Sequence, residues 1–143
     1  MKNNGKPSEK LFEEAWARLG KRAWAFSFTD TAEARGMNKG KNVFVKAQPA
    51  DYLVVYQGAI FFAEVKSTID AERFKFSLLR TSQSYAAAAT LAAGGPYYIF
   101  IHSLAQSRWY RVPYDVVAAA KAEKKGSLLW SELESFSWSF PNA

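Results

Sequence analysis

Hydrophobic residues recur along the chain with two different periods, one typical of helices and one typical of strands. Within residues 8–19 they follow helical spacing and form one stripe, which consists of Leu11, Phe12, Ala15, Trp16 and Leu19. Ser8 is a suitable N-cap for this segment, and Gly20 is a suitable stop. We therefore predict a first helix over residues 8–19, with Glu9 at the border of its apolar stripe.

Two adjacent segments, 51–56 and 59–66, have the pattern of strands and are joined by Gln57-Gly58. A two-residue connection with glycine second is typical of a tight hairpin. In that register the numbers of paired residues sum to 115, so Asp51 faces Glu64. Because side chains alternate along a strand, Glu64 and Lys66 share one face of the sheet.

Shorter patterns predict the other elements. These are a strand over 23–29, a short strand over 43–47, a polar loop over 67–75, a helix over 77–93, a buried strand over 97–102, a strand over 108–112 and a helix over 113–124. The tail after residue 127 is rich in aromatic residues and is expected to pack on the body. The order of elements predicts one mixed α/β domain over residues 1–143, with a central β-sheet flanked by helices.

Aromatic residues of the predicted strands are assigned to the core by default. Trp24 and Phe26 belong to this set, and alternation places them with Phe28 on one side of the strand over 23–29. The other members are Phe61, Phe62 and Tyr98. The apolar residues exceed what a chain this short needs for its own core. We therefore expect apolar surface, including the tail that carries Trp130 and Trp138, to pack against a second copy.

The charge balance of the 143 residues gives a moderate indication of the kind of partner that the protein binds. Nineteen Lys and Arg oppose 13 Asp and Glu, and the resulting net charge of +6 favours a polyanionic partner. The chain has no cysteine and one histidine, His102, which excludes disulfides, thiolate metal sites and multi-histidine zinc sites. Residues 81–107 lack charge, but Gly94-Gly95-Pro96 divides them into pieces too short to span a membrane. We expect a cytoplasmic protein without a membrane segment.

A polar segment over residues 30–42 contains two glycines and three basic residues, Arg35, Lys39 and Lys41. Two interpretations remain open for it. The segment is either a solvated loop or an arm that contacts a ligand.

Asp51, Glu64 and Lys66 carry the chemistry that the hairpin brings together. Two neighbouring carboxylates are stabilised when a cation lies between them, and oxygen ligands favour Mg²⁺ or Mn²⁺. A lysine beside the metal can orient water and stabilise charge on a phosphate, as metal-assisted phosphodiester hydrolysis requires. The alternative is a solvated strand face with a surface ion pair.

Pro49-Ala50-Asp51 followed by Glu64-Val65-Lys66 resembles the signature of the PD-(D/E)XK nuclease superfamily. Further segments resemble the RecU-type Holliday-junction resolvases of bacteria and their phages. These segments are Asn4-Gly5 with Glu9, Ala50-Asp51-Tyr52 with Tyr56-Gln57-Gly58, Glu64 to Thr68, Arg73-Phe74 through Gln83, Tyr97–Ile101 and Tyr110–Pro113. The chain departs from the pattern at Ser67 and Ser82, and residues 30–42 are compact for the stalk of such resolvases.

The resemblance implies a role for each matching residue. Asp51, Glu64 and the backbone carbonyl of Val65 would hold Mg²⁺, for which Mn²⁺ can substitute, and Lys66 would position the attacking water. Glu9 would complete the acidic cluster, with Glu13 as the alternative. Gln83 would lie beside the site and hold the lysine or a phosphate.

The same resemblance implies a structure-specific endonuclease that cleaves four-way DNA junctions in recombination and repair, as a homodimer without a small-molecule cofactor. Candidate phosphate contacts are Arg35, Lys39, Lys41, Lys46, Arg73, Lys75 and Arg80. A bacterial, archaeal or phage genome would encode such a protein. The alternatives are another nuclease on the same fold, of restriction or nicking type, and a junction-binding protein without catalytic activity.

Overall fold

The computed structural model describes residues 5–28 and 47–143. Within these residues six strands form a central sheet in the order β1-β2-β3-β5-β6-β8. Their bounds are β1 Ala23–Ser27, β2 Tyr52–Tyr56, β3 Ala59–Thr68, β5 Tyr97–Ser103, β6 Arg108–Pro113 and β8 Ser137–Trp138. β3 and β5 are parallel, whereas the other neighbouring strands are antiparallel. A mixed α/β domain with a central sheet is thereby confirmed.

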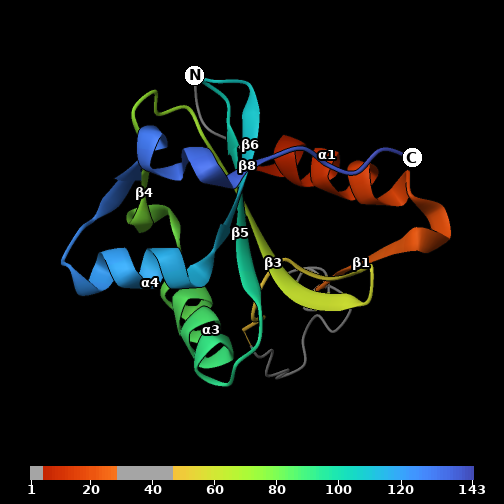
Figure 1. Cartoon of the computed structure of the whole chain (residues 1–143), viewed down its shortest axis with the longest axis horizontal. Helices are drawn as coiled ribbons and strands as arrows, with labels where there is room; N and C mark the ends of the chain where they lie inside the picture. Colours follow the sequence, from red (N-terminus) through yellow and green to blue (C-terminus); the bar gives the residue numbers. More distant parts are fainter. Residues whose placement is uncertain (1–4, 29–46) are drawn as a thin grey trace, which may run out of the picture.

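Helices and a small second sheet cover the two faces of the central sheet (Figure 1). The helices are α1 Lys6–Ala17, α3 Thr81–Ala92 and α4 Tyr114–Ala122, and the 3-10 helices are η1 Gly20–Arg22, η2 Phe76–Leu78 and η3 Trp130–Phe136. The second sheet pairs β4, Arg73–Lys75, with β7, Ser127–Leu129. In the described part of the chain, no helix is long and apolar enough to cross a membrane.

β5 separates two hydrophobic cores because its side chains alternate between the faces of the sheet. Ile99 and Ile101 belong to the core beneath α3 and α4. Phe100 points the other way and packs with Phe12 and Trp16 of α1. β5 is therefore covered on both faces, as its continuous apolar sequence predicted.

The β2–β3 hairpin has the predicted register. Tyr56 pairs with Ala59 and Tyr52 pairs with Ala63, so the numbers of paired residues sum to 115. Gln57 and Gly58 both have positive φ angles, 52° and 79°, which is the conformation that the right-handed twist of a two-residue hairpin requires.

α1 begins at Lys6, earlier than predicted, and Ser8 lies inside the helix rather than at its N-cap. The proline in the first turn needs no hydrogen-bond partner there, and the acidic Glu9 is favoured by the helix dipole. Ser8 is buried because it faces the sheet, together with Phe12, Ala15 and Trp16. Leu11, which was predicted in the apolar stripe, is 44% exposed.

The predicted polar loop over residues 67–75 is wrong at both ends. Ser67 and Thr68 extend β3 by pairing with β5, and residues 73–75 form β4 by pairing with β7. The predicted helix over 77–93 starts only at Thr81, after η2. These differences arise from strand partners far away in the sequence, which local patterns do not reveal.

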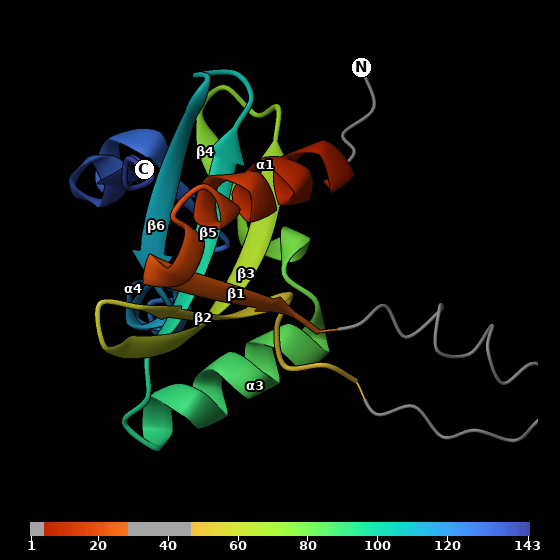
Figure 2. The same cartoon turned by 90° about the vertical axis from the view of Figure 1, so that its right-hand side faces the viewer.

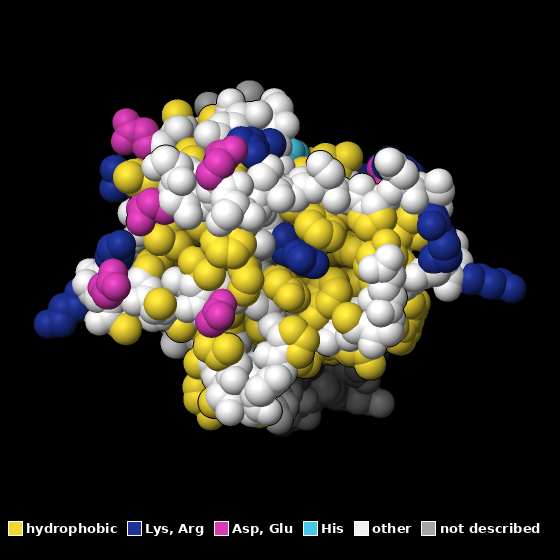
Figure 3. All heavy atoms as spheres, viewed as in Figure 1, with side chains coloured by type: hydrophobic (Ala, Val, Ile, Leu, Met, Phe, Trp, Pro, Cys, Tyr) yellow, Lys and Arg dark blue, Asp and Glu magenta, His cyan; other side chains and the backbone are white. Residues whose placement is uncertain are grey.

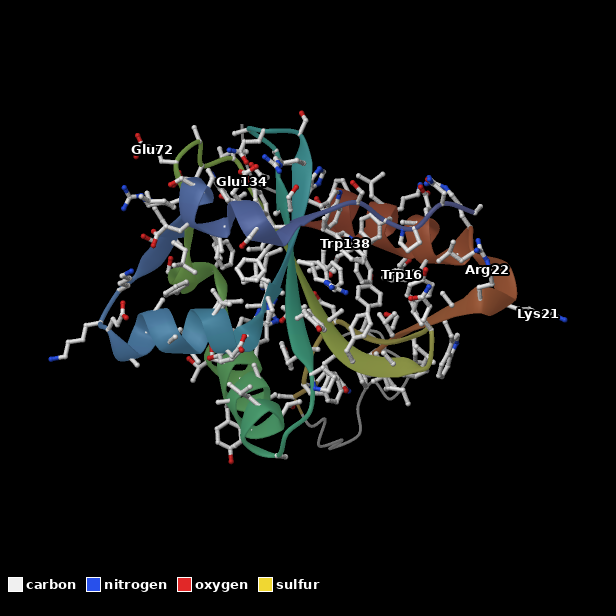
Figure 4. The ribbon with its side chains drawn as sticks, in the orientation of Figure 1. Trp16, Lys21, Arg22, Glu72, Glu134 and Trp138 are labelled. Atoms are coloured by element: carbon white, nitrogen blue, oxygen red, sulfur yellow. The ribbon has the colours of Figure 1, made fainter. Side chains whose placement is uncertain are left out.

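The aromatic tail packs on the body, as expected. β8 adds an edge strand beside β6, and Trp138 lies close to Trp16 beneath α1 (Figure 4). Trp130 is 3% exposed, because its ring stacks on Tyr110 and its indole N–H donates to the Asp70 carbonyl. The tail therefore belongs largely to the domain's own core, and its tryptophans do not supply the apolar surface that was expected for a second copy.

Two aromatic residues that were assigned to the core are at the surface. Trp24 is 57% exposed and Phe26 is 42% exposed, whereas Phe61 is buried and Phe62 and Tyr98 are half-buried. The predicted arm over 30–42 and, apart from Ala47, the predicted strand over 43–47 lie outside the described residues.

Candidate active site

The site begins where β2 ends and β3 continues. β2 starts at Tyr52, so the β3 backbone beyond Ala63 has no strand partner on that side among the described residues. Asp51 fills this position, since its Oδ2 accepts a hydrogen bond of 2.9 Å from the Val65 backbone N–H. The bond fixes the Asp51 carboxylate beside Glu64.

Glu64 is completely buried, and neither of its carboxylate oxygens has a hydrogen-bond partner within the described part of the chain. Burial raises the pKa of this carboxyl strongly, and the neighbouring Asp51 carboxylate raises it further. Lys66 and Arg80 act in the opposite direction. A buried carboxylate without partners is costly unless a cation compensates it, so this pair fits a hard divalent ion.

Lys66 lies two residues after Glu64 on the same face of β3, where the two pair with Ile101 and Ile99 of β5. Its side chain is half-buried. Among the described residues it has no carboxylate within 4.0 Å, so the ammonium group is not held in an ion pair there. Its positive charge lowers the pKa values of both Glu9 and Glu64, so it lies near both carboxyl groups.

Glu9 approaches from the first turn of α1. Its pKa is raised by partial burial, and the nearby Asp51 and Glu13 carboxylates raise it further. Glu13 has a different partner, because it accepts a hydrogen bond of 2.7 Å from the Tyr52 hydroxyl. No three acidic or histidine side chains in the described residues lie close enough to hold one ion, so Glu9 stands beside the Asp51–Glu64 pair rather than in a formed cluster.

The first turn of α3 contributes Arg80 and Gln83. Gln83 is buried, and its Oε1 accepts a hydrogen bond of 3.0 Å from the Arg80 backbone N–H, so it caps the start of the helix. Within the described residues the Gln83 side chain is hydrogen-bonded to the Arg80 backbone and not to Lys66. Figure 2 shows the start of α3 on the same side of the molecule as the start of α1.

Tyr97 is a site residue that the sequence did not reveal. Its hydroxyl donates a hydrogen bond of 2.7 Å to the Pro49 carbonyl and so fixes the turn that leads to Asp51. Burial raises the pKa of this phenol, and the Glu64 and Asp51 carboxylates raise it further. The available signal was a tyrosine in an otherwise apolar buried strand, since a buried hydroxyl needs a partner.

His102 lies near the end of β5 and supports α1. Its Nδ1 shares a hydrogen bond of 2.8 Å with the Ser8 hydroxyl, and its ring stacks on Trp109. Burial lowers the pKa of this imidazole. The Ser8–His102 bond fixes the turn of α1 that carries Glu9.

The candidate phosphate contacts are distributed unevenly. Arg80 lies next to the site, whereas Arg73 and Lys75 belong to β4, on the opposite side of Figure 1 from β1. Arg73 pairs with Glu72 at 3.5 Å, and Lys75 pairs with Asp70 at 3.7 Å. The remaining candidates, Arg35, Lys39, Lys41 and Lys46, lie outside the described residues.

The fold is similar to that of a solved structure of Hjc, a Holliday junction resolvase from the archaeal hyperthermophile Archaeoglobus fulgidus. The TM-score is 0.54 at 14% sequence identity, and the match covers 90% of this chain and 89% of the other. No protein-family model matches the chain. No curated protein matches its sequence either.

Proposed function

We propose that this protein is a Mg²⁺-dependent DNA endonuclease that cleaves four-way junctions. The observation that supports this most directly is the buried Glu64 carboxylate beside Asp51, with Lys66 on the same strand face. The fold shared with an archaeal Holliday junction resolvase and the net charge of +6 agree with it. The RecU-type subclass rests on the sequence resemblance alone.

Asp51 and Glu64 would hold the metal ion, together with the backbone carbonyl of Val65. Their oxygen atoms match the preference of Mg²⁺, and Mn²⁺ would fit the same ligands. The bound ion would supply Lewis-acid stabilisation of the charge that develops on the phosphate. Glu9, whose pKa is affected by the charges of both Asp51 and Lys66, would complete the acidic cluster.

Lys66 would orient the attacking water and hold it against the phosphorus. Its ammonium group is suited to this because no carboxylate of the described residues binds it in an ion pair. Arg80, at the start of α3, adds a second positive charge where a phosphate would lie. The buried Gln83 keeps that turn in place through its bond to the Arg80 backbone.

Cleavage assays with two variants test this proposal. We expect Glu64→Gln and Lys66→Ala to retain junction binding but to lose cleavage by at least about a hundredfold, because each removes a charge that acts on the reacting phosphate. The substrates are a labelled four-way junction and its linear duplex arms, with Mg²⁺ or with EDTA. The exposed Glu14 and Lys124 offer matched controls, Glu14→Gln and Lys124→Ala.

The outcomes separate the three candidate functions. Cleavage of the junction but not of the duplex supports a resolvase. Equal cleavage of both indicates a restriction-type or nicking enzyme on the same fold, and binding without cleavage indicates a junction-binding protein. Wild-type rates in Glu64→Gln and Lys66→Ala would show that the active site lies elsewhere.

A further inference from the structure

Four aromatic rings form a continuous row on the surface of the first three strands. Trp24, Phe26 and Phe28 follow one another along one side of β1 and beyond its end, with ring centroids 5.5 and 5.6 Å apart. Phe28 lies 6.0 Å from Phe62 of β3. We call these four residues the aromatic strip.

The aromatic strip lies on the same face of the sheet as the catalytic carboxylates. Strand pairing places Phe26, Leu53 and Phe62 in one row across β1, β2 and β3. The next row along contains Phe28 and Asp51, which are joined by a 3.0 Å hydrogen bond from the Phe28 N–H to the Asp51 carbonyl. Because the Asp51 carboxylate lies beside Glu64 through its hydrogen bond to the Val65 N–H, the strip runs directly into the site.

The described residues leave two rings of this strip, Trp24 and Phe26, exposed. Trp24 and Phe26 are 57% and 42% exposed, and Ile60, which shares a row with Trp24, is 57% exposed. The opposite side of β1 carries Ala23 and Ala25, which pack into the core beneath α1. A large apolar surface that continues into an active site is typical of a binding surface.

Positive charges stand at both ends of the strip. Lys21 and Arg22 precede β1 and extend from the right-hand end of the molecule in Figure 4, where basic side chains also appear in Figure 3. At the other end are Lys66 and Arg80, beside Glu64. A nucleic-acid strand has the complementary chemistry, with π faces on its bases and negative charge on its phosphates.

We propose that the aromatic strip stacks unpaired nucleobases of the DNA strand that enters the active site. The proposal rests on the proposed nuclease function and narrows its substrate to strands whose bases are unstacked next to the scissile phosphate. Stacking on aromatic rings tolerates any base sequence, as recognition of DNA shape requires. A second copy of this chain, which also has a net charge of +6, lacks the charge complementarity of DNA.

Binding measurements without metal test the aromatic strip apart from catalysis. Fluorescence anisotropy in EDTA compares a labelled oligothymidylate of about ten nucleotides with a duplex of equal length. We expect Trp24→Ala and Phe26→Ala each to weaken single-strand binding about tenfold and to change duplex binding less than about twofold. Trp24→Phe, which keeps a ring, should bind nearly as the parent does.

Tyr85→Ala is the matched control. Tyr85 is 78% exposed on α3, two residues after the buried Gln83 and therefore on the opposite side of that helix. This variant removes an exposed ring outside the strip and should bind both DNAs normally. Because all the replaced rings are exposed, circular dichroism melting should show that every variant folds.

Three results would overturn the proposal. They are wild-type single-strand affinity in Trp24→Ala and Phe26→Ala, an equal loss on single strand and duplex, and conversion of a dimer to a monomer by these changes. The last would identify the strip as an interface between copies. The two proposals can also fail separately. If the variants lose single-strand binding but the parent protein cleaves no DNA with Mg²⁺, the strip binds nucleobases and the proposed nuclease function is wrong.

Discussion

Glu64 carries a carboxyl group at a position where an apolar side chain would normally be expected. It is fully buried and pairs with Ile99 of β5. In the folded protein its pKa is raised by burial and by Asp51, so it keeps its proton over a pH range in which the unfolded chain has released it. The folded state then binds more protons, and the free energy of unfolding falls as the pH rises above the ordinary pKa of a glutamate.

Replacing Glu64 by glutamine should therefore stabilise the metal-free protein. We expect the free energy of unfolding of Glu64→Gln at neutral pH to exceed that of the parent by about 1–3 kcal/mol in EDTA, because glutamine is neutral in both states, whereas the parent must hold a proton on Glu64 in the folded state that its unfolded chain releases. The gain should shrink near pH 4, where the parent carboxyl is protonated in both states. Thermal melting across this pH range measures both effects.

Addition of Mg²⁺ separates this prediction from a simple packing effect. The ion should raise the melting temperature of the parent and leave that of Glu64→Gln almost unchanged, because binding to the folded state alone is stabilising. Glu14→Gln, an exposed change on α1, should match the parent throughout. Identical pH profiles for the parent and Glu64→Gln would contradict the assignment of a raised pKa to this residue.

At the scale of elements, the C-terminal tail completes the core beneath α1. The Phe140 ring lies 5.8 Å from Phe12, 5.9 Å from Trp16 and 5.2 Å from Trp109. It follows β8 directly and joins α1 to the sheet. The end of the chain thereby packs against its first helix.

Phe140→Ala should lower the free energy of unfolding by about 2 kcal/mol, less than for a fully buried phenylalanine because this ring is half-buried. Urea unfolding followed by tryptophan fluorescence measures the change. Ser139→Ala, at the exposed neighbouring position, should have no measurable effect. Equal stability of the two variants would mean that the tail does not contribute to the core in solution.

At the scale of the whole molecule, paired cleavage of a four-way junction needs two equivalent sites. A two-fold homodimer supplies them from one gene. We therefore predict a dimer in solution, with twice the chain mass of 16.0 kDa in sedimentation at micromolar concentration. A 16.0 kDa species alone would remove the paired-nick mechanism and leave nuclease activity itself in place.

The sequence predicted those features that neighbouring residues determine. The two-residue turn and the alternation of side chains fixed the β2–β3 register, and with it the adjacency of Asp51, Glu64 and Lys66. Asp51 accepts a hydrogen bond from the Val65 N–H, which is only fourteen positions further along the chain and belongs to the same hairpin. The core of the candidate site was therefore accessible without a structure.

Contacts between distant segments were accessible only in the tertiary structure. β4 was expected as a loop because its partner β7 lies more than fifty residues further along, and short segments form strands only when paired. The approach of Glu9, Arg80 and Tyr97 to the carboxylates likewise depends on how α1, α3 and β5 pack on the sheet.

For Trp24 and Phe26, too, the sequence predicted one property and only the tertiary structure showed the other. Alternation along the strand placed both rings on one side, and the structure confirms this. Alternation does not specify which side of an edge strand is covered, because that depends on where the helices pack. α1 packs against the alanine side of β1, so the rings remain at the surface beside the candidate active site.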